Sequence, residues 1–362
     1  MKRAITILLA TLMVVGAVVI FIPKPDLKTF TTYSSAFFDS QGSLLRITLA
    51  EDQRYRIHQT LDQISPELVN ATLLYEDQHY YDHWGVDYLA LLRAFWTTYV
   101  TKDRRIGAST ITMQVARLRW NIPSHTISGK IQQILRALQL TRHYSKKDIL
   151  QVYFNLAPYG RNIEGIAAAS LIYFNKRPDQ LSLPEALTLA VIPQNPNKRN
   201  PTTTTGNQHL LVARNNLLQR WLAEYPLDLH QQKYFGMPLN VRAPEELPFL
   251  AAHFIDYVSQ QMSRWDNGFI HTTIDATLQK TIEHVVKNYV SSKAPVGINN
   301  ASALLINHQT MEVKAMVGSV EFNNVEIKGQ VNGVLAKRSP GSTLKPFVYA
   351  LAMDEGLVHP MT

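Results

Sequence analysis

The fold is decided around residues 65–77, SPELVNATLLYED, which carry the signals that begin a helix. Ser65 is a residue type that caps helices, and Pro66 suits the first helical position. The apolar residues that follow recur at helical spacing, and the paired carboxylates of Glu76 and Asp77 close the segment. We therefore expect a helix that buries one face in a helical domain.

Further helix signals follow one another closely from this segment to residue 225. They are, in chain order, a cap at Asp87 before residues 88–99, Ser109 or Thr110 before a helix to about Trp120, apolar periodicity over residues 130–142, and capping boxes at Ser145 with Asp148 and at Ser182 with Glu185. The sequence thus predicts an all-helical domain over residues 56–225.

On the N-terminal side, residues 24–55 contain short alternating runs that predict one or two strands in a linker. Residues 4–22 form an uncharged stretch of 19 residues, long enough for a helix across a bilayer. The stretch has no small-x-small cleavage site, which favours an uncleaved anchor within residues 1–23 over a cleaved signal peptide. Lys2 and Arg3 place the N-terminus in the cytoplasm and the rest of the chain outside.

On the C-terminal side, proline-rich residues begin a linker region that we assign to residues 226–295. Residues 301–306 and 313–320 then predict paired strands around a turn, and residues 343–355 predict a helix. Residues 296–362 are therefore expected to form a small α+β part, and the chain as a whole to be mainly α.

Composition and charge narrow the class of protein. The 362 residues are 46% hydrophobic and 18% charged, too apolar for a disordered chain, and the absence of Cys excludes thiolate metal sites, a Cys nucleophile and disulfides. The net charge of +8 lies entirely in residues 101–150, which hold ten Lys or Arg and two Asp. This block predicts a surface for a polyanion, or else solvated helix faces. Outside the membrane, lipid phosphates are a better match than nucleic acid.

The first group of chemically capable residues lies at residues 76–85, EDQHYYDHWG. A carboxylate in an apolar, aromatic setting can have a raised pKa and act as a general base. The alternatives are that Asp77 and His83 only fix a turn while Glu76 is solvated, or that His79 and His83 bind zinc at helical spacing.

The second group is at residues 107–117, GASTITMQVAR, where two hydroxyl residues stand at a helix start. Free backbone amides there attract phosphate, although an ordinary cap is the simpler interpretation. The third group is at residues 339–347, SPGSTLKPF. On one helical turn, the amine of Lys345 can take the proton of the Ser342 hydroxyl and activate it as an acyl acceptor.

Four ordered blocks at residues 76–85, 107–117, 130–140 and 146–160 resemble the signature motifs of the family 51 peptidoglycan glycosyltransferases. Residues 339–347 resemble the nucleophile motif of penicillin-binding transpeptidases. The order of anchor, glycosyltransferase and transpeptidase is similar to that of class A penicillin-binding proteins. The residues of the motifs are most similar to those of the 1C type.

This resemblance implies a lysozyme-like helical domain that polymerises lipid II outside the bacterial inner membrane, followed by a fragment of a transpeptidase domain. It implies that Glu76 is the base for the acceptor hydroxyl, that Asp77 orients Glu76, and that Gln133 stands at the position of a second catalytic glutamate. The substrate-binding positions that it implies are His83, Ser109, Thr110, Gln114, Arg117, Lys130 and Asn155. Partners would be lipid II, the growing glycan strand, the membrane and other cell-wall proteins.

Departures from the family pattern qualify these expectations. Gln133 binds a cation poorly, so no metal ligand is assigned and Mg²⁺ or Mn²⁺ is left open as a cofactor. The remaining transpeptidase motifs are expected beyond residue 362, so Ser342 and Lys345 are a remnant from which we expect no crosslinking. A lipid II-binding scaffold without turnover and a glycan-cleaving enzyme are the alternative functions. Residues 89–100 are either a membrane-surface segment or a core helix.

Overall fold

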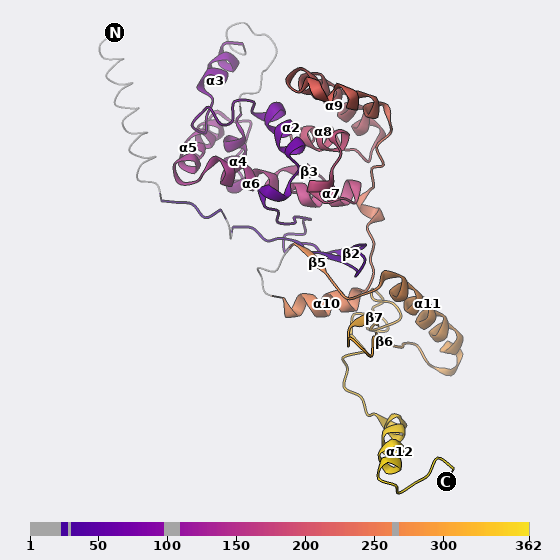
Figure 1. Ribbon diagram of the computed structural model, residues 1–362. Coiled ribbons are helices and arrows are strands. Elements are labelled where there is room, and N and C mark those ends of the chain that lie inside the picture. The colour runs from indigo at the N-terminus through magenta and orange to yellow at the C-terminus, as the bar shows by residue number, and fades with distance from the viewer. Residues whose placement is uncertain (1–22, 28–29, 98–108, 263–267, 362) are drawn as a thin grey trace, which may run out of the picture. The chain divides into compact units, whose positions relative to one another are not determined.

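The computed structural model describes residues 23–27, 30–97, 109–262 and 268–361 (Figure 1). The described residues form two compact units. The first contains those within residues 1–38, 44–248 and 262–271, and the second contains those within residues 39–43, 249–261 and 272–362. The predicted anchor at residues 4–22, with Lys2 and Arg3, lies outside the described residues. Within the described ranges, no helix combines the length and apolar character needed to cross a bilayer.

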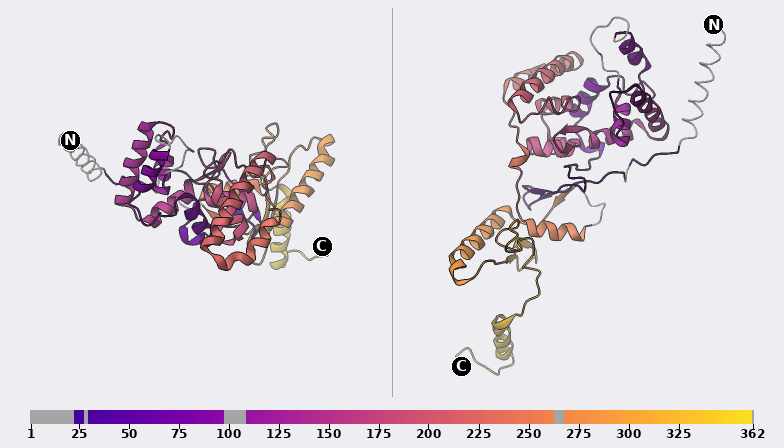
Figure 2. Two further views of the ribbon diagram at one scale, coloured as in Figure 1. Left: turned by 90° about the horizontal axis from the view of Figure 1, so that it is seen from above. Right: turned by 180° about the vertical axis from the view of Figure 1, so that it is seen from behind.

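The first unit is helical, as the sequence predicts. Its helices are α2 (Pro66–Glu76), α3 (Tyr88–Phe95), α4 (Ile111–Trp120), α5 (Ile127–His143), α6 (Lys146–Leu156), α7 (Ile166–Phe174), α8 (Leu183–Val191) and α9 (Thr204–Glu224), with 3-10 turns at Leu61–Gln63, Pro178–Gln180, Pro226–Gly236 and Pro244–Glu246. Helix α8 packs against α2 and α9, which are labelled beside it in Figure 1. The right-hand view of Figure 2 shows the same helices from behind. Every residue of α7 is buried, which makes α7 a central helix of the core.

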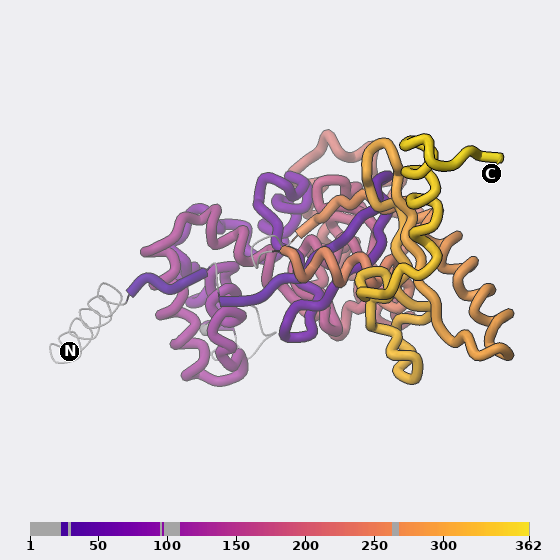
Figure 3. Tube along the Cα trace, turned by 90° about the horizontal axis from the view of Figure 1, so that it is seen from below, coloured from indigo at the N-terminus to yellow at the C-terminus, as the bar shows by residue number. Residues whose placement is uncertain are grey.

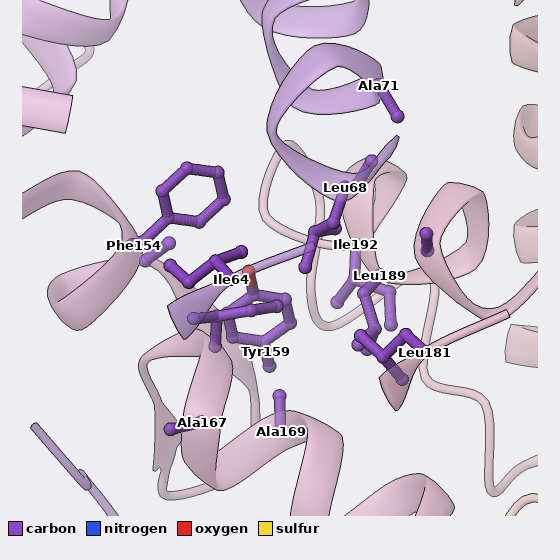
Figure 4. Packing of buried hydrophobic residues seen from close by; sticks show 14 of the residues in the cluster. Ile64, Leu68, Ala71, Phe154, Tyr159, Ala167, Ala169, Leu181, Leu189 and Ile192 are labelled. Atoms are coloured by element: carbon purple, nitrogen blue, oxygen red, sulfur yellow. The ribbon is translucent and has the colours of Figure 1, made fainter. Parts of the chain in front are cut away.

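Apolar side chains from several helices meet in one continuous core. Leu68 of α2, Phe154 of α6 and Ile192 after α8 gather around Ile64 in Figure 4. Tyr159 is buried in the same cluster. Because an Ile or Leu buried in such a core contributes about 2–5 kcal/mol, this packing dominates the stability of the unit.

The helix ends follow the local signals in the sequence. The Ser65 side chain accepts a hydrogen bond from the Leu68 amide, and both predicted capping boxes, at Ser145 and Ser182, are formed. Helix α4 begins at Ile111 with Thr110 as its cap. Helix α5 begins three residues before the predicted start, because Thr126 caps it. Residues 98 and 99 of the predicted 88–99 helix lie outside the described residues.

Short strands accompany the helices. Strands β1 (Ala36–Phe38) and β2 (Leu44–Ile47) pair antiparallel in the stretch where the sequence predicts strands. Strand β5 (Phe269–His271) pairs in parallel with β1, so residues from the expected linker region complete a three-stranded sheet. A small hairpin of β3 (Pro158–Gly160) and β4 (Ile163–Glu164) interrupts the helices, so the expectation of an all-helical domain is wrong there. Gly165 follows it at φ +78°, where an added Cβ would lie 2.8 Å from the Asn155 carbonyl oxygen.

The segment that precedes β1 is bonded to the helical unit at several points; we call residues 23–27 and 30–33 the N-terminal strap. Gln139 of α5 donates a hydrogen bond to the Pro23 carbonyl (2.8 Å), and Tyr144 donates to that of Pro25. Arg119 of α4 donates to the Asp26 carbonyl (3.2 Å) and lies over the Phe30 ring. The strap is therefore held against the ends of α4 and α5.

The second unit contains α10 (Ala252–Gln261), α11 (Ala276–Lys293), the hairpin β6 (Ala303–Ile306) and β7 (Val313–Val317), and α12 (Lys345–Asp354), with 3-10 turns at Ala294–Val296 and Gly341–Leu344. Figure 3 traces the chain through this unit from orange to yellow. The predicted strand pair is confirmed, with Ala303 opposite Val317. Gln279 of α11 exchanges two hydrogen bonds with the Met316 backbone of β7 and fixes the helix on the hairpin.

Candidate active site

Glu76 ends α2 and meets Gln114 of α4. The Gln114 amide nitrogen donates a hydrogen bond to Oε2 of Glu76 at 2.7 Å, while Oε1 is buried with no hydrogen-bond partner among the described residues. Burial raises the pKa of Glu76, and the hydrogen bond from Gln114 and the charges of Arg199 and Arg117 oppose that rise. A carboxylate with one free oxygen and a raised pKa is suited to accept a proton.

Asp77 does not share this environment, although it is the next residue. Its buried carboxylate accepts hydrogen bonds from the Ile111 amide (2.9 Å) and from His83 Nε2 (3.0 Å). Thr110 donates from Oγ1 to the Gly85 carbonyl (2.7 Å) and caps α4. Asp77, His83 and Thr110 thus fasten the start of α4 to the end of α2, which fixes Gln114 relative to Glu76.

The zinc alternative for the two histidines does not fit this geometry. His79 is exposed and contacts Asp82 at 3.2 Å, whereas His83 is largely buried and contacts Asp77 at 3.0 Å. Across the described ranges, no group of three His, Cys, Asp or Glu side chains is arranged to hold a metal ion.

A second cluster, which we call the cationic cluster, consists of Ser109, Arg117, Lys130 and Gln133. The Lys130 amine donates hydrogen bonds to Ser109 Oγ (2.7 Å) and to Gln133 Oε1 (3.1 Å). Burial lowers the pKa of Lys130, and the nearby charge of Arg117 acts in the same direction. Ser109, α4 and α5 thus bring together two cations and two polar groups without a carboxylate among them, an arrangement that favours an anionic ligand.

The rest of the basic block divides among other roles. Lys102, Arg104 and Arg105 lie outside the described residues. Arg136 lies over the Trp120 ring, and Lys146 donates a hydrogen bond to the Tyr80 carbonyl. Arg136 and Lys146 therefore support the fold, whereas Arg117 lies near Glu76 and Lys130 contacts Gln133.

Asn155 holds the backbone and leaves no side-chain group free for a ligand. Its Oδ1 accepts from the Gln59 amide, and its Nδ2 donates to the carbonyls of Gln59 and Gln151, each at 2.8 Å. The Gln151 side chain accepts in turn from the Leu61 amide at 3.2 Å. Asn155 and Gln151 therefore tie α6 to residues 59–61.

Sequence reasoning missed three residues near Glu76. Tyr153 and Tyr159 are buried phenols whose pKa is raised, first by burial and then by the charge of Glu76. Arg199 lies over the Tyr75 ring and lowers the pKa of Glu76. Tyr153 and Tyr159 both lie in the motif block at residues 146–160, which could have pointed to them, but Arg199 lies in no motif.

Ser342 and Lys345 belong to the second unit. Ser342 lies in the 3-10 turn Gly341–Leu344, and Lys345 begins α12. Both residues are exposed, and within the described part of the chain their side chains share no hydrogen bond. The pair therefore lacks the contact by which Lys345 would activate Ser342.

Comparison with known proteins finds a family model that matches each unit. A family model described as Transglycosylase matches residues 41–221, and a model described as Penicillin binding protein transpeptidase domain matches residues 301–362. Penicillin-binding protein 1C of Escherichia coli is 39% identical over 85% of this chain and 39% of its own length. Penicillin-binding protein 1A of the same organism is 33% identical over 66% of this chain and 29% of its own length.

This chain thus spans less than half the length of either relative. A solved structure of penicillin-binding protein 1A from Haemophilus influenzae matches 77% of this chain and 32% of that one at 19% identity, with a TM-score of 0.33.

Proposed function

Because this chain belongs to the transglycosylase family, we propose that it is a peptidoglycan glycosyltransferase, which polymerises lipid II into β-1,4-linked glycan strands. The observation that carries the proposal is the hydrogen bond between Glu76 and Gln114 beside a cationic cluster. It supplies a base for an acceptor hydroxyl and cations for a pyrophosphate leaving group within one unit.

In the proposed reaction, Oε1 of Glu76 takes the proton of the acceptor sugar 4-hydroxyl. The oxygen attacks the anomeric carbon of the donor, the bond to undecaprenyl pyrophosphate breaks, and the configuration inverts. Lys130, Arg117 and Ser109 bind the charge that develops on the pyrophosphate, a role for which fixed donors in a partly buried site are effective. Asp77 acts by positioning, since its oxygens hold His83 and the start of α4.

The proposed substrate is a membrane lipid, and α3 offers a surface for the bilayer. Leu89 is 72% exposed, Leu92 65% and Trp96, which follows α3, 62%. Aromatic and aliphatic side chains of this kind favour the membrane interface over water. The exposure of these residues supports the membrane-surface interpretation of residues 89–100 over a core helix. With residues 4–22 as anchor, this unit would work on the outer side of the inner membrane.

We further propose that the second unit of this chain performs no crosslinking. Acyl transfer needs the Lys345 amine beside the Ser342 hydroxyl and a set of donors for the oxyanion. The exposure of both residues supports this proposal.

Incubation of the detergent-solubilised chain with lipid II tests the proposed activity. We expect glycan strands that moenomycin suppresses, and we expect Glu76→Gln to reduce their formation about 10²–10⁴-fold, since a general base contributes that much. Glu67→Gln, at an exposed position of the same helix, is the matched control and should leave the rate unchanged.

The same experiment separates the alternatives. Lipid II binding without strands would contradict the proposal and favour the scaffold. Release of fragments from purified sacculi would contradict it in favour of glycan cleavage.

A further inference from the structure

The orientation of the Gln133 side chain is set by its neighbour. Lys130 has only donors, so the group of Gln133 that faces its amine must be the amide oxygen, at 3.1 Å. The Nε2 group then points away from Lys130. Gln133 is 1% exposed, and Nε2 has no hydrogen-bond partner among the described residues. A buried donor left in this way destabilises the folded chain, and a ligand that supplies an acceptor can recover that loss.

Arg117 presents a second buried donor of the same kind. Its Nε has no hydrogen-bond partner within the described ranges, and its charge reaches both Lys130 and Glu76. The donors of Arg117, Lys130 and Gln133 come from α4 and α5, which pack against each other. Among the described residues, Gln133 Nε2 and Arg117 Nε have no acceptor, whereas Lys130 donates to Ser109 and Gln133. The carboxylate of Glu76 already accepts from Gln114 on one oxygen.

A divalent cation does not fit the donor set of this cluster. Mg²⁺ and Mn²⁺ take oxygen ligands, preferably carboxylates, and position 133 offers one amide oxygen that an ammonium already occupies. The Nε2 group is a donor and would repel a cation. A glutamate at position 133 would instead pair with Lys130 and neutralise one positive charge, leaving an anion dependent on a bridging metal.

We propose that Gln133 makes the cationic cluster a metal-independent pyrophosphate site, in which its Nε2 donates directly to a phosphate oxygen together with Lys130 and Arg117. This inference rests on the proposed function for the identity of the anion. It assigns Gln133 a binding role toward the leaving group in place of the metal-binding or charge-bearing role of a glutamate.

Isothermal titration calorimetry of the full chain in detergent with inorganic pyrophosphate measures the affinity of the site directly. The wild type should bind with the same affinity in EDTA and in Mg²⁺. Gln133→Glu should lose at least about tenfold in EDTA, since it removes a donor and adds a like charge, and Mg²⁺ should restore much of the affinity. Gln133→Met, close in shape, should lose about tenfold in both buffers.

Gln132→Met, at the exposed neighbouring position, is the matched control and should bind as the wild type does. Circular dichroism confirms that each variant is folded, and the wild-type comparison of EDTA with Mg²⁺ needs no variant at all. Mg²⁺-dependent binding by the wild type, or wild-type affinity in a folded Gln133→Met, would overturn the inference.

Lipid II polymerisation by the wild type in EDTA separates this inference from the proposed function. Strands formed in EDTA support both. Strands formed only with Mg²⁺ would overturn the metal-independent site and leave the glycosyltransferase activity standing. Absence of strands in both buffers, with pyrophosphate binding that survives EDTA, would overturn the activity and support the anion site.

Discussion

Helices α7 and α12 have similar apolar sequences, IAAASLIYF and KPFVYALAMD, and opposite surroundings. All nine residues of α7 are buried, because α6, α8 and β4 pack around it. No residue of α12 is buried, and Phe347, Val348 and Leu351 are exposed. An apolar helix therefore contributes to stability only when other elements cover it. In this chain the first unit supplies such elements and the described part of the second does not.

The largest expected effect comes from truncating one apolar side chain in each helix. Ile172→Ala in α7 should reduce the free energy of unfolding by about 4 kcal/mol, since the side chain is fully buried. Leu351→Ala in α12, where the side chain is 64% exposed, should change it by about 0.5 kcal/mol or less. Denaturant unfolding of the purified chain, followed separately for each unit, measures both. Equal losses would show that α12 is covered in solution and would break the contrast.

A pair of glycines, one in each unit, tests the same contrast between packed and open surroundings with a smaller expected effect. Gly165 and Gly297 both have positive φ, but an added Cβ contacts the Asn155 backbone only at Gly165 and meets nothing within 4 Å at Gly297. Gly165→Ala should cost about 2–3 kcal/mol and Gly297→Ala about 1 kcal/mol, because only the first adds a clash to the backbone strain. Thermal unfolding of the two variants checks the difference, and a cost at Gly297 equal to that at Gly165 would contradict it.

The pH dependence of catalysis tests whether function also resides in the packed unit. The pKa of Glu76 is raised by burial and held down by Gln114, so Gln114→Met should raise it further and move the acidic limb of kcat/KM to higher pH. Rates of lipid II polymerisation across pH measure the limb. An unmoved limb in a folded variant would exclude Glu76 as the titrating base.

Stability should follow the same carboxyl group with a definite sign. Because the folded-state pKa of Glu76 is raised, its favourable contribution is present below the unfolded-state pKa and is lost as pH rises through the folded-state pKa. Glu76→Gln should therefore be more stable than the wild type above that pH and similar below it. Melting curves at several pH values check this ordering, and a less stable variant at neutral pH would contradict it.

The smallest expected effect is at the remnant nucleophile. Ser342→Ala should leave lipid II polymerisation unchanged, and the wild type should not react with labelled penicillin, because Ser342 and Lys345 are exposed and share no hydrogen bond in the described structure. Gel fluorescence after labelling gives the result. A band in the wild type that disappears in Ser342→Ala would contradict this prediction, because it would show that Ser342 is activated in solution.

Local features were predictable from the sequence and non-local ones were not. Ser65 and Thr110 cap helices through bonds to residues three positions away, so their signal lies within one turn. The pairing of β5 with β1 joins segments more than 200 residues apart, and no short pattern encodes it. For the same reason, the family motifs singled out Glu76 and Gln114 separately but did not predict the hydrogen bond between them. Arg199 was missed altogether, since only tertiary packing brings it near Glu76.

The bonds that hold the N-terminal strap limit the distance between the helical unit and a membrane that residues 4–22 would cross. If residues 4–22 cross the bilayer, the bonds from Gln139, Tyr144 and Arg119 to the strap fix how far α4 stands from the membrane surface. Each extended residue inserted between residue 22 and Pro23 would raise that height by up to about 3.3 Å. Helix α4 also carries Gln114 and Arg117, so this height would set whether the pyrophosphate of a membrane-bound lipid comes within their reach.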